Sequence, residues 1–196
     1  FCNIMTRRQV VFLTVCFLSI CTSPCVSAAQ SGKGCPKNCA CEEVAGGSVV
    51  NCKGLNLAAV PKGLPLDTTY FNMANNSLTE LKLIHLYNLT KLEGVCMTDN
   101  DITEIKGTFT FFEHLNQIDI SKNKLETVKN TVFGNSLPQF RLIDLSGNPL
   151  NCDCHLKWLR VAADGTELLG NNATCVEPPP LSGKRLLDVP PSDFKC

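Results

Sequence analysis

The chain has 196 residues, and its 18 Lys and Arg residues balance its 18 Asp and Glu residues, so the formal net charge is zero. Without an excess of basic residues, the composition gives no support to a nucleic-acid binder. Hydrophobic residues make up 44% of the chain, which suits one compact domain, and its 13 cysteines indicate an oxidising, secretory compartment.

The first 29 residues predict a secretory signal peptide. Arg7 and Arg8 precede an apolar run over 10–21, and small residues follow at 27–29. The apolar run is shorter than the roughly 20 residues of a membrane span, so we favour a secreted protein over an anchored one. We expect cleavage after Ala28 or Ala29, and we interpret 1–4 as lying upstream of the true start at Met5. We find no later membrane span and no lipid-anchor signal.

Residues 30–66 carry a first cluster of four cysteines. Such a quartet can bind zinc or form two disulfides. The secretory route and the absence of paired short spacings favour disulfides, although spacing alone leaves three pairings open. The members are Cys35, Cys39, Cys41 and Cys52.

Four copies of an 11-residue pattern begin within residues 67–147, with asparagine at position 9 and apolar side chains at positions 1, 4, 6 and 11, apart from Thr68 at the first position of the first copy. The copies begin at Thr68, Leu92, Leu115 and Phe140. A period of roughly 24 residues with this pattern is the signature of a leucine-rich repeat. It predicts an α/β solenoid, a short array of about four repeats with a parallel β-sheet on its concave side.

The position-9 asparagines have a separate role in this prediction. An amide side chain both donates and accepts hydrogen bonds, so it can satisfy backbone groups that a tight turn leaves unpaired. Repeated at one position, these residues predict a buried ladder through the solenoid. Its members are Asn76, Asn100, Asn123 and Asn148.

Residues 148–196 carry a second cysteine cluster. A solenoid exposes its apolar core at each end and needs a cap there, and a small cap needs covalent staples. We therefore expect disulfide-stapled modules at both ends of the array. The second cluster is Cys152, Cys154, Cys175 and Cys196.

Both flanks resemble a known family. The segment CPKNCACEEVAGGSVVNCKGLNLAAVPKGLPLDTTYFNM is similar to the amino-terminal cysteine-rich flank of extracellular leucine-rich-repeat proteins. The segments NPLNCDCHLKWLRV and CVEPPPLSGKRLLDVPPSDFKC resemble the carboxy-terminal flank of Slit proteins, peroxidasins, neuronal leucine-rich-repeat receptors and the variable lymphocyte receptors of jawless fish. The resemblance covers residues 35–196.

The resemblance implies that the first cysteine of each flank pairs with the third and the second with the fourth. It also implies that Trp158 and Leu159 lie on a short helix that plugs the end of the repeat core. The implied pairs are Cys35 with Cys41, Cys39 with Cys52, Cys152 with Cys175, and Cys154 with Cys196.

The outward positions of the concave sheet form the candidate binding surface. Side chains standing in register on rigid strands are preformed, which lowers the ordering cost of association. We expect Tyr70 and Leu142 to act as apolar anchors, with Asp119 and Asp144 as an acidic stripe, although simple solvation also accounts for the two acids. The predicted ligand contacts are Tyr70, Asn72, Gln117, Asp119, Leu142 and Asp144.

No catalytic, cofactor or metal site is predicted. Two carboxylates can serve acid-base catalysis, but an open sheet provides neither an enclosing pocket nor a histidine in register. His85, His114 and His155 are scattered along the chain and form no recognisable metal motif.

Cys96 lies at position 5 of the second copy, where the pattern points it to the concave face. With the signal peptide removed it has no predicted partner. It is then an unpaired cysteine, which predicts either a disulfide-linked homodimer or a solitary thiol.

Three N-glycosylation sequons occur, at Asn75, Asn88 and Asn172. Asn88 and Asn172 are expected on surface segments. Asn75 lies at the edge of the concave sheet, so a glycan there would move ligand binding toward the third and fourth repeats.

These observations predict a non-enzymatic, secreted or cell-surface recognition module that binds an extracellular protein ligand. The chain divides into a leader (1–29), an amino-terminal cap (30–66), repeats (67–147) and a carboxy-terminal cap (148–196). Two alternatives stay open. The chain could be a truncated ectodomain of a larger receptor or matrix protein, including a peroxidasin-like enzyme with its catalytic domain downstream, or it could be an immune-recognition receptor.

Overall fold

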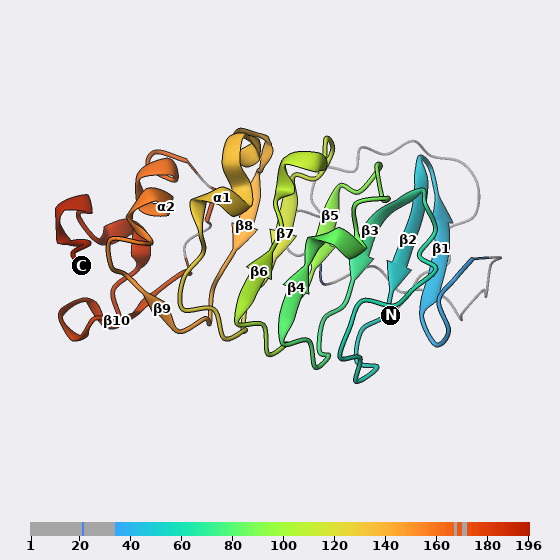
Figure 1. Cartoon of the computed structure of the whole chain (residues 1–196), viewed down its shortest axis with the longest axis horizontal. Helices are drawn as coiled ribbons and strands as arrows, with labels where there is room; N and C mark the ends of the chain where they lie inside the picture. The colour runs from blue at the N-terminus through green and yellow to red at the C-terminus, as the bar shows by residue number, and fades with distance from the viewer. Residues whose placement is uncertain (1–20, 22–33, 167, 170–171) are drawn as a thin grey trace, which may run out of the picture.

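The structure is a computed structural model of the whole chain, and it describes residues 21, 34–166, 168–169 and 172–196. The predicted signal peptide and its cleavage site lie outside the described residues, apart from Cys21. Figure 1 shows the strands stacked side by side from the amino-terminal cap to the carboxy-terminal cap.

The main sheet contains six strands within the described residues, in the order β1-β2-β3-β5-β7-β8. The first two form an antiparallel hairpin, and every later neighbour pairs in parallel. This arrangement confirms the predicted solenoid with a parallel sheet. The strands are β1 (Ala40–Val44), β2 (Gly47–Asn51), β3 (Thr68–Asn72), β5 (Gly94–Cys96), β7 (Gln117–Asp119) and β8 (Leu142–Asp144).

Equivalent positions of the repeats lie directly beside one another. Position 4 forms one row, whose side chains point into the core and are at most 1% exposed. Side chains alternate along a strand, so positions 3 and 5 form two rows on the opposite, concave face. The position-4 row is Phe71, Val95, Ile118 and Ile143.

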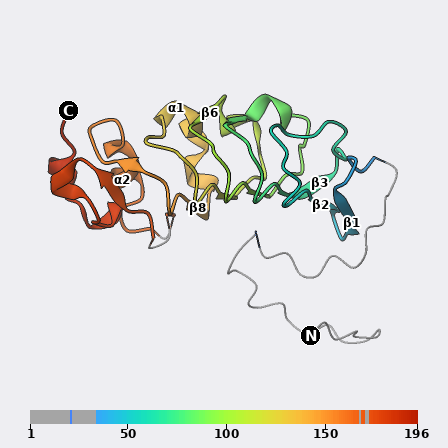
Figure 2. The ribbon, with the colours of Figure 1, turned by 90° about the horizontal axis from the view of Figure 1, so that it is seen from below.

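The convex side is less regular than the sheet. It holds a second, two-stranded parallel sheet of β4 (Glu80–Lys82) and β6 (Glu104–Lys106), followed by short helical turns. Figure 2 shows these turns on the side of the coil opposite the main sheet. The turns are η1 (Leu83–His85), η2 (Phe109–Phe111), α1 (Asn130–Phe133) and η3 (Gly134–Gln139).

Aromatic side chains fill the core beneath these turns. The ring centroids of Phe109 and Phe133 are 5.0 Å apart, and those of Phe133 and Phe140 are 5.2 Å apart. Phe133 also contacts Trp158, with centroids separated by 6.1 Å. Tilted and edge-on pairs of this kind add to the stabilisation that burial provides.

The position-9 asparagines are buried and bonded to the backbone of two successive turns of the coil. Asn100 accepts a hydrogen bond from Leu78 N at 3.0 Å, and its amide donates to Met73 O and Met97 O at 3.0 Å each. Asn123 repeats this set with Ile102, Met97 and Ile120. Asn76 and Asn148 make equivalent bonds.

Disulfides staple both caps. The cysteine pairs are those that the family resemblance implies: Cys35 with Cys41, Cys39 with Cys52, Cys152 with Cys175, and Cys154 with Cys196. The carboxy-terminal cap comprises β9 (Leu150–Asn151), α2 (Lys157–Ala162), β10 (Cys175–Glu177), η4 (Pro179–Leu181), η5 (Leu186–Asp188) and η6 (Pro191–Asp193).

Helix α2 closes the carboxy-terminal end of the core. Leu159 is fully buried, and the Trp158 indole donates from Nε1 to Val128 O at 2.8 Å. The outer edge of β8 is also covered, because Ile143 N donates to Leu168 O at 2.7 Å. No helix in the described part of the chain is both long and apolar enough to cross a membrane.

Candidate ligand-binding surface

The position-3 row supplies the accessible side chains of the concave sheet. Tyr70, Gln117 and Leu142 lie in register with Gly94, and each of the three is half-buried. The Tyr70 hydroxyl donates to Glu93 Oε2 at 3.0 Å. Burial and this hydrogen bond raise the pKa of the Tyr70 phenol, so the ring stays neutral.

The position-5 row has a different role from the one predicted. Asn72 Oδ1 accepts a hydrogen bond from Ala74 N at 2.9 Å, Asp119 Oδ1 accepts one from Ser121 N at 2.9 Å, and Asp144 Oδ1 accepts one from Ser146 N at 2.8 Å. These side chains satisfy the turn that follows each strand. Asn72 and Asp119 are only 4% and 8% exposed, so they offer a ligand little surface, whereas Asp144 is half-buried.

The hydrogen bond from the position-5 side chain to the following turn can be recognised in the sequence, although strand alternation alone does not reveal it. An Asn or Asp that ends a strand can accept a bond from the backbone N–H two residues later. Asn51 does so for Lys53, ahead of the first repeat. In the second repeat Cys96 occupies this position, and its side chain has no carbonyl or carboxylate oxygen for the turn.

A short polar chain runs across the concave face to Asp119. The Ser121 hydroxyl donates to Asp119 Oδ1 at 2.6 Å, so the Thr98 hydroxyl, 2.7 Å away, donates to Ser121 Oγ. Burial raises the pKa of the Asp119 carboxyl, the Ser121 hydrogen bonds oppose that rise, and the charges of Asp144 and Asp99 add to it.

The rim of the surface carries charges of both signs. Asp99 and Lys122 are exposed, with Oδ2 and Nζ 3.8 Å apart. Arg141 is exposed immediately before β8, and Glu93 precedes β5. The six predicted contacts did not include these four residues, although Asp99 and Lys122 occupy position 8 of the pattern.

Cys96 has a partner in the whole chain, whereas the prediction of an unpaired thiol concerned the chain without its leader. It is 1% exposed and forms a disulfide with Cys21, with Cα atoms 5.5 Å apart. The side chain does point to the concave face, but Cys21 reaches it there. Cys21 was left out of the predicted pairing because it lies in the predicted signal peptide. In this arrangement the Cys96 sulfur is already bonded, which gives a homodimer through Cys96 no support.

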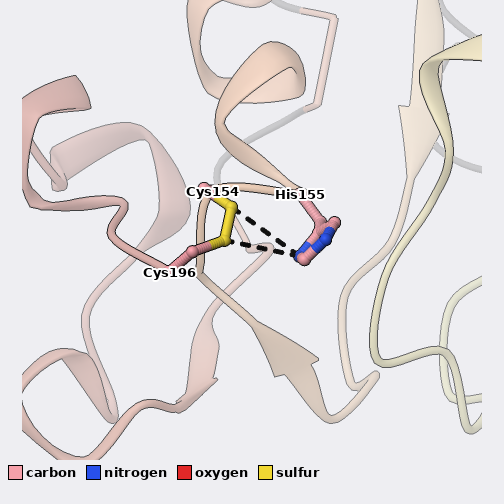
Figure 3. Close-up of side chains that lie close together, drawn as sticks. All are labelled: Cys154, His155 and Cys196. Atoms are coloured by element: carbon pink, nitrogen blue, oxygen red, sulfur yellow. Dashed lines mark hydrogen bonds between the residues drawn. A yellow bond between two sulfur atoms is a disulfide. The ribbon is translucent and has the colours of Figure 1, made fainter.

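A cluster of potential metal ligands lies in the carboxy-terminal cap, formed by Cys154, His155 and Cys196. Figure 3 shows His155 beside the Cys154–Cys196 disulfide, with Nδ1 3.8 Å from each sulfur. Sulfurs bonded to each other are not thiolate ligands, so these three residues do not form a zinc site. His155 Nδ1 also lies 3.2 Å from Asp153 Oδ1.

The three sequon asparagines have exposed side chains. Asn75 adopts a positive φ of 55° just beyond β3, and its backbone N–H donates to Thr98 O at 2.9 Å. A glycan there would stand at the rim of the concave sheet. Occupancy of Asn75, Asn88 and Asn172 stays a prediction.

Comparisons with known proteins match both caps. A family model described as leucine rich repeat N-terminal domain matches residues 34–65, and one described as leucine rich repeat C-terminal domain matches residues 172–196.

Individual relatives match longer stretches. Leucine-rich repeat-containing protein 3 of Danio rerio is 32% identical over 125 residues, 63% of this chain and 46% of that protein. Tsukushi of Gallus gallus is 28% identical over 192 residues, 85% of this chain and 50% of that protein. Leucine-rich repeat-containing G-protein coupled receptor 5 of Xenopus tropicalis is 32% identical over 113 residues, 56% of this chain and 12% of the receptor. The chain thus spans about half the length of the first two relatives and a small part of the third.

Proposed function

Since the chain is a leucine-rich-repeat protein with cysteine-rich caps at both ends, we propose that it is a non-enzymatic extracellular recognition module that binds a protein ligand on its concave sheet. The register of Tyr70, Gln117 and Leu142 carries the proposal. These half-buried side chains stand on strands β3, β7 and β8 of one sheet, which the asparagine ladder and the caps hold in place. Such a surface needs little ordering on binding.

The composition of the surface suits a protein partner. Tyr70 and Leu142 supply apolar area, and Asp99, Lys122 and Arg141 supply a charged rim. Apolar side chains accompanied by polar and charged groups are usual in a protein interface, and tyrosine is enriched among the residues that dominate binding energy. The disulfides in both caps suit an oxidising compartment, which supports secretion or display at the cell surface.

A second candidate is that the same module is the recognition domain of a larger membrane receptor. The match to a small part of a protein named as a G-protein coupled receptor supports this candidate. Both candidates use the same concave surface. They differ in the size and the membrane attachment of the native protein, which fractionation of the source tissue followed by immunoblotting would distinguish.

The test is a binding screen against a panel of secreted and cell-surface ectodomains, followed by matched alanine substitutions. Tyr70→Ala and Leu142→Ala should each weaken binding about tenfold or more, as expected for large side chains that bury apolar area in an interface. Ile84→Ala and Phe111→Ala are matched controls on the convex side, because these side chains are apolar and 64% and 63% exposed.

The controls should leave affinity unchanged. Thermal unfolding of each variant would show whether a loss of binding arises from misfolding. A ligand that tolerates both concave substitutions but is lost on either convex substitution would overturn the proposed surface.

A further inference from the structure

The Cys154–Cys196 disulfide is more exposed than the other disulfides of the structure. Both of its cysteines are exposed, whereas the cysteines of every other disulfide in the described part of the chain are half-buried or buried. A thiol in solution therefore reaches this bond without opening the core. Exposed disulfides are also the ones that exchange with thiols most readily.

An imidazole ring lies beside both sulfurs of this disulfide, as Figure 3 shows. His155 Nδ1 is 3.8 Å from Cys154 Sγ and 3.8 Å from Cys196 Sγ. Asp153 Oδ1 lies 3.2 Å from the same nitrogen, and a carboxylate oxygen only accepts hydrogen bonds, so Nδ1 carries a proton. The ring thus presents an N–H group next to the two sulfurs.

The Asp153 carboxylate that orients this ring is itself held by neighbouring groups. Oδ1 accepts a hydrogen bond from His155 N at 2.8 Å, and Oδ2 accepts one from Asn151 Nδ2 at 3.0 Å. The Asp153 side chain is 24% exposed, whereas that of His155 is 70% exposed. A carboxylate fixed at both oxygens holds the imidazole toward the disulfide before any reagent arrives.

The carboxy-terminal cap has other anchors besides this disulfide. The Cys152–Cys175 disulfide lies in the same cap, and its two cysteines are at most 1% exposed. Between Cys175 and Cys196, four apolar side chains are at most 4% exposed and belong to the core. Opening the exposed disulfide should therefore leave the cap folded. The four side chains are Leu181, Leu186, Val189 and Phe194.

We propose that the Cys154–Cys196 disulfide is a thiol-exchange site, at which a small cysteinyl peptide of the glutathione class becomes bonded to Cys196. Cys154 is the leaving sulfur, because it directly precedes His155 and stays beside Nδ1. Cys196 lies beyond Phe194, which is buried, and the intervening Lys195 is exposed, so Cys196 is free to move away with the peptide. The hydrogen bond from Nδ1 stabilises the negative charge that develops on the departing sulfur.

The exchange balances without a further reagent. The thiolate of the peptide attacks Cys196 Sγ, and the bond between Cys196 and Cys154 breaks as the new sulfur–sulfur bond forms. Cys154 leaves as a thiolate and takes up the proton that the peptide thiol lost. One disulfide replaces another, so neither an oxidant nor a reductant is consumed.

The test uses the full chain, secreted from cultured cells, as wild type and as His155→Ala. His114→Ala is the matched control, because His114 is also exposed but lies between η2 and β7, outside the cap. Each protein is treated with reduced glutathione for timed intervals, and N-ethylmaleimide stops the reaction. Peptide mapping by mass spectrometry then locates glutathione and maleimide on individual cysteines.

The wild-type protein should gain one glutathione on Cys196 and one maleimide on Cys154. This adduct should form about tenfold or more faster than an adduct at any other cap disulfide. His155→Ala should slow its formation about tenfold, as expected for the loss of a hydrogen bond to a charged group, and should spread glutathione over both cysteines. His114→Ala should react like the wild type.

The direction of the His155→Ala effect separates the proposed role from a structural one. A cap loosened by the substitution would expose the disulfide further and speed the exchange, whereas loss of the N–H donor slows it. Equal or faster exchange in His155→Ala would overturn the proposal, as would wild-type glutathione mainly on Cys154. Opening of Cys152–Cys175 at the same rate would also contradict it, because the reaction would then require unfolding of the cap.

Discussion

Each ladder asparagine links two successive turns of the coil through one side chain. Asn100 receives the Leu78 N–H from one turn and donates to carbonyls that include Met97 O in its own repeat. All these groups are buried, so removing the amide would leave several backbone partners unsatisfied at once. A ladder residue is therefore worth more than a single exposed hydrogen bond.

Asn100→Ala should lower the free energy of unfolding by about 3 kcal/mol, because buried backbone groups lose their partner. Urea denaturation monitored by circular dichroism measures the change. Asn135→Ala is the control, since Asn135 is exposed in η3, and it should change stability by less than about 0.5 kcal/mol. Equal effects of the two substitutions would contradict the structural role of the ladder.

At neutral pH the buried Asp119 carboxyl lowers the free energy of unfolding, whereas the ladder asparagines raise it. Burial raises its pKa in the folded state, so the folded chain holds this proton more tightly than the unfolded chain does. The resulting stability is fully present below the ordinary aspartate pKa of about 4 and is lost as the pH rises through the raised value.

With the Cys21–Cys96 disulfide intact, Asp119→Asn should therefore stabilise the protein at neutral pH, and the gain should vanish in acid. Thermal unfolding measured from acid to neutral pH tests both the gain at neutral pH and its disappearance in acid. Glu80→Gln should behave oppositely, because hydrogen bonds from Lys106 and Lys82 lower the pKa of the Glu80 carboxyl. An Asp119→Asn gain that persists unchanged in acid would contradict this account.

Among the elements, α2 depends on one polar contact at the end of an aromatic stack. Trp158 contacts Phe133 and donates its indole N–H to Val128 O. Trp158→Phe keeps an aromatic ring but removes the N–H donor and the five-membered part of the indole, so it should cost at least about 1 kcal/mol of unfolding free energy. Phe111→Leu, at a side chain 63% exposed on η2, should cost much less. Chemical denaturation measures the unfolding free energy of both variants, and equal losses would contradict the role of the Trp158 hydrogen bond.

The strands and their register could be predicted from the sequence, because the period of about 24 residues repeats the same apolar positions and the stacked repeats must align them. Phe71, Val95, Ile118 and Ile143 consequently fall in one row. The convex elements could not be predicted in detail. The residues between pattern copies differ, and their turns pack in whatever form buries side chains such as Phe109 and Phe133.

The candidate site was only partly predictable for a related reason. Alternation gives the direction of a side chain but not its hydrogen-bond partner. Asn72 and Asp119 point to the concave face, yet the following turn engages both. Likewise, position 5 places Cys96 on that face, whereas its bond to Cys21 spans 75 residues of sequence and has no local signal.

At the scale of the whole molecule, the caps set how easily the array unravels from its ends. Cys39 and Cys52 are 13 residues apart and buried, with Cys52 fully so, whereas Cys35 and Cys41 are 6 apart. A longer closed loop gives a disulfide more entropy to remove from the unfolded chain.

Replacing both Cys39 and Cys52 with serine should cost about 3 kcal/mol, and the paired Cys35→Ser and Cys41→Ser change should cost less. Changing both members of a pair avoids stray thiols. Thermal unfolding with amide hydrogen exchange over β1 and β2 tests the order, and a greater loss from the Cys35 and Cys41 pair would reverse it.

The covered ends of the main sheet also bear on colloidal behaviour. Beyond β8, Leu168 O takes the N–H of Ile143, and β1 bears the exposed acids Glu42 and Glu43. A growing fibre needs a bare strand edge as its template, and charged or occupied edges deny it one. Molecules in a concentrated solution should therefore not aggregate by adding strands to each other's sheet edges. The main sheet should keep the same number of strands at every protein concentration.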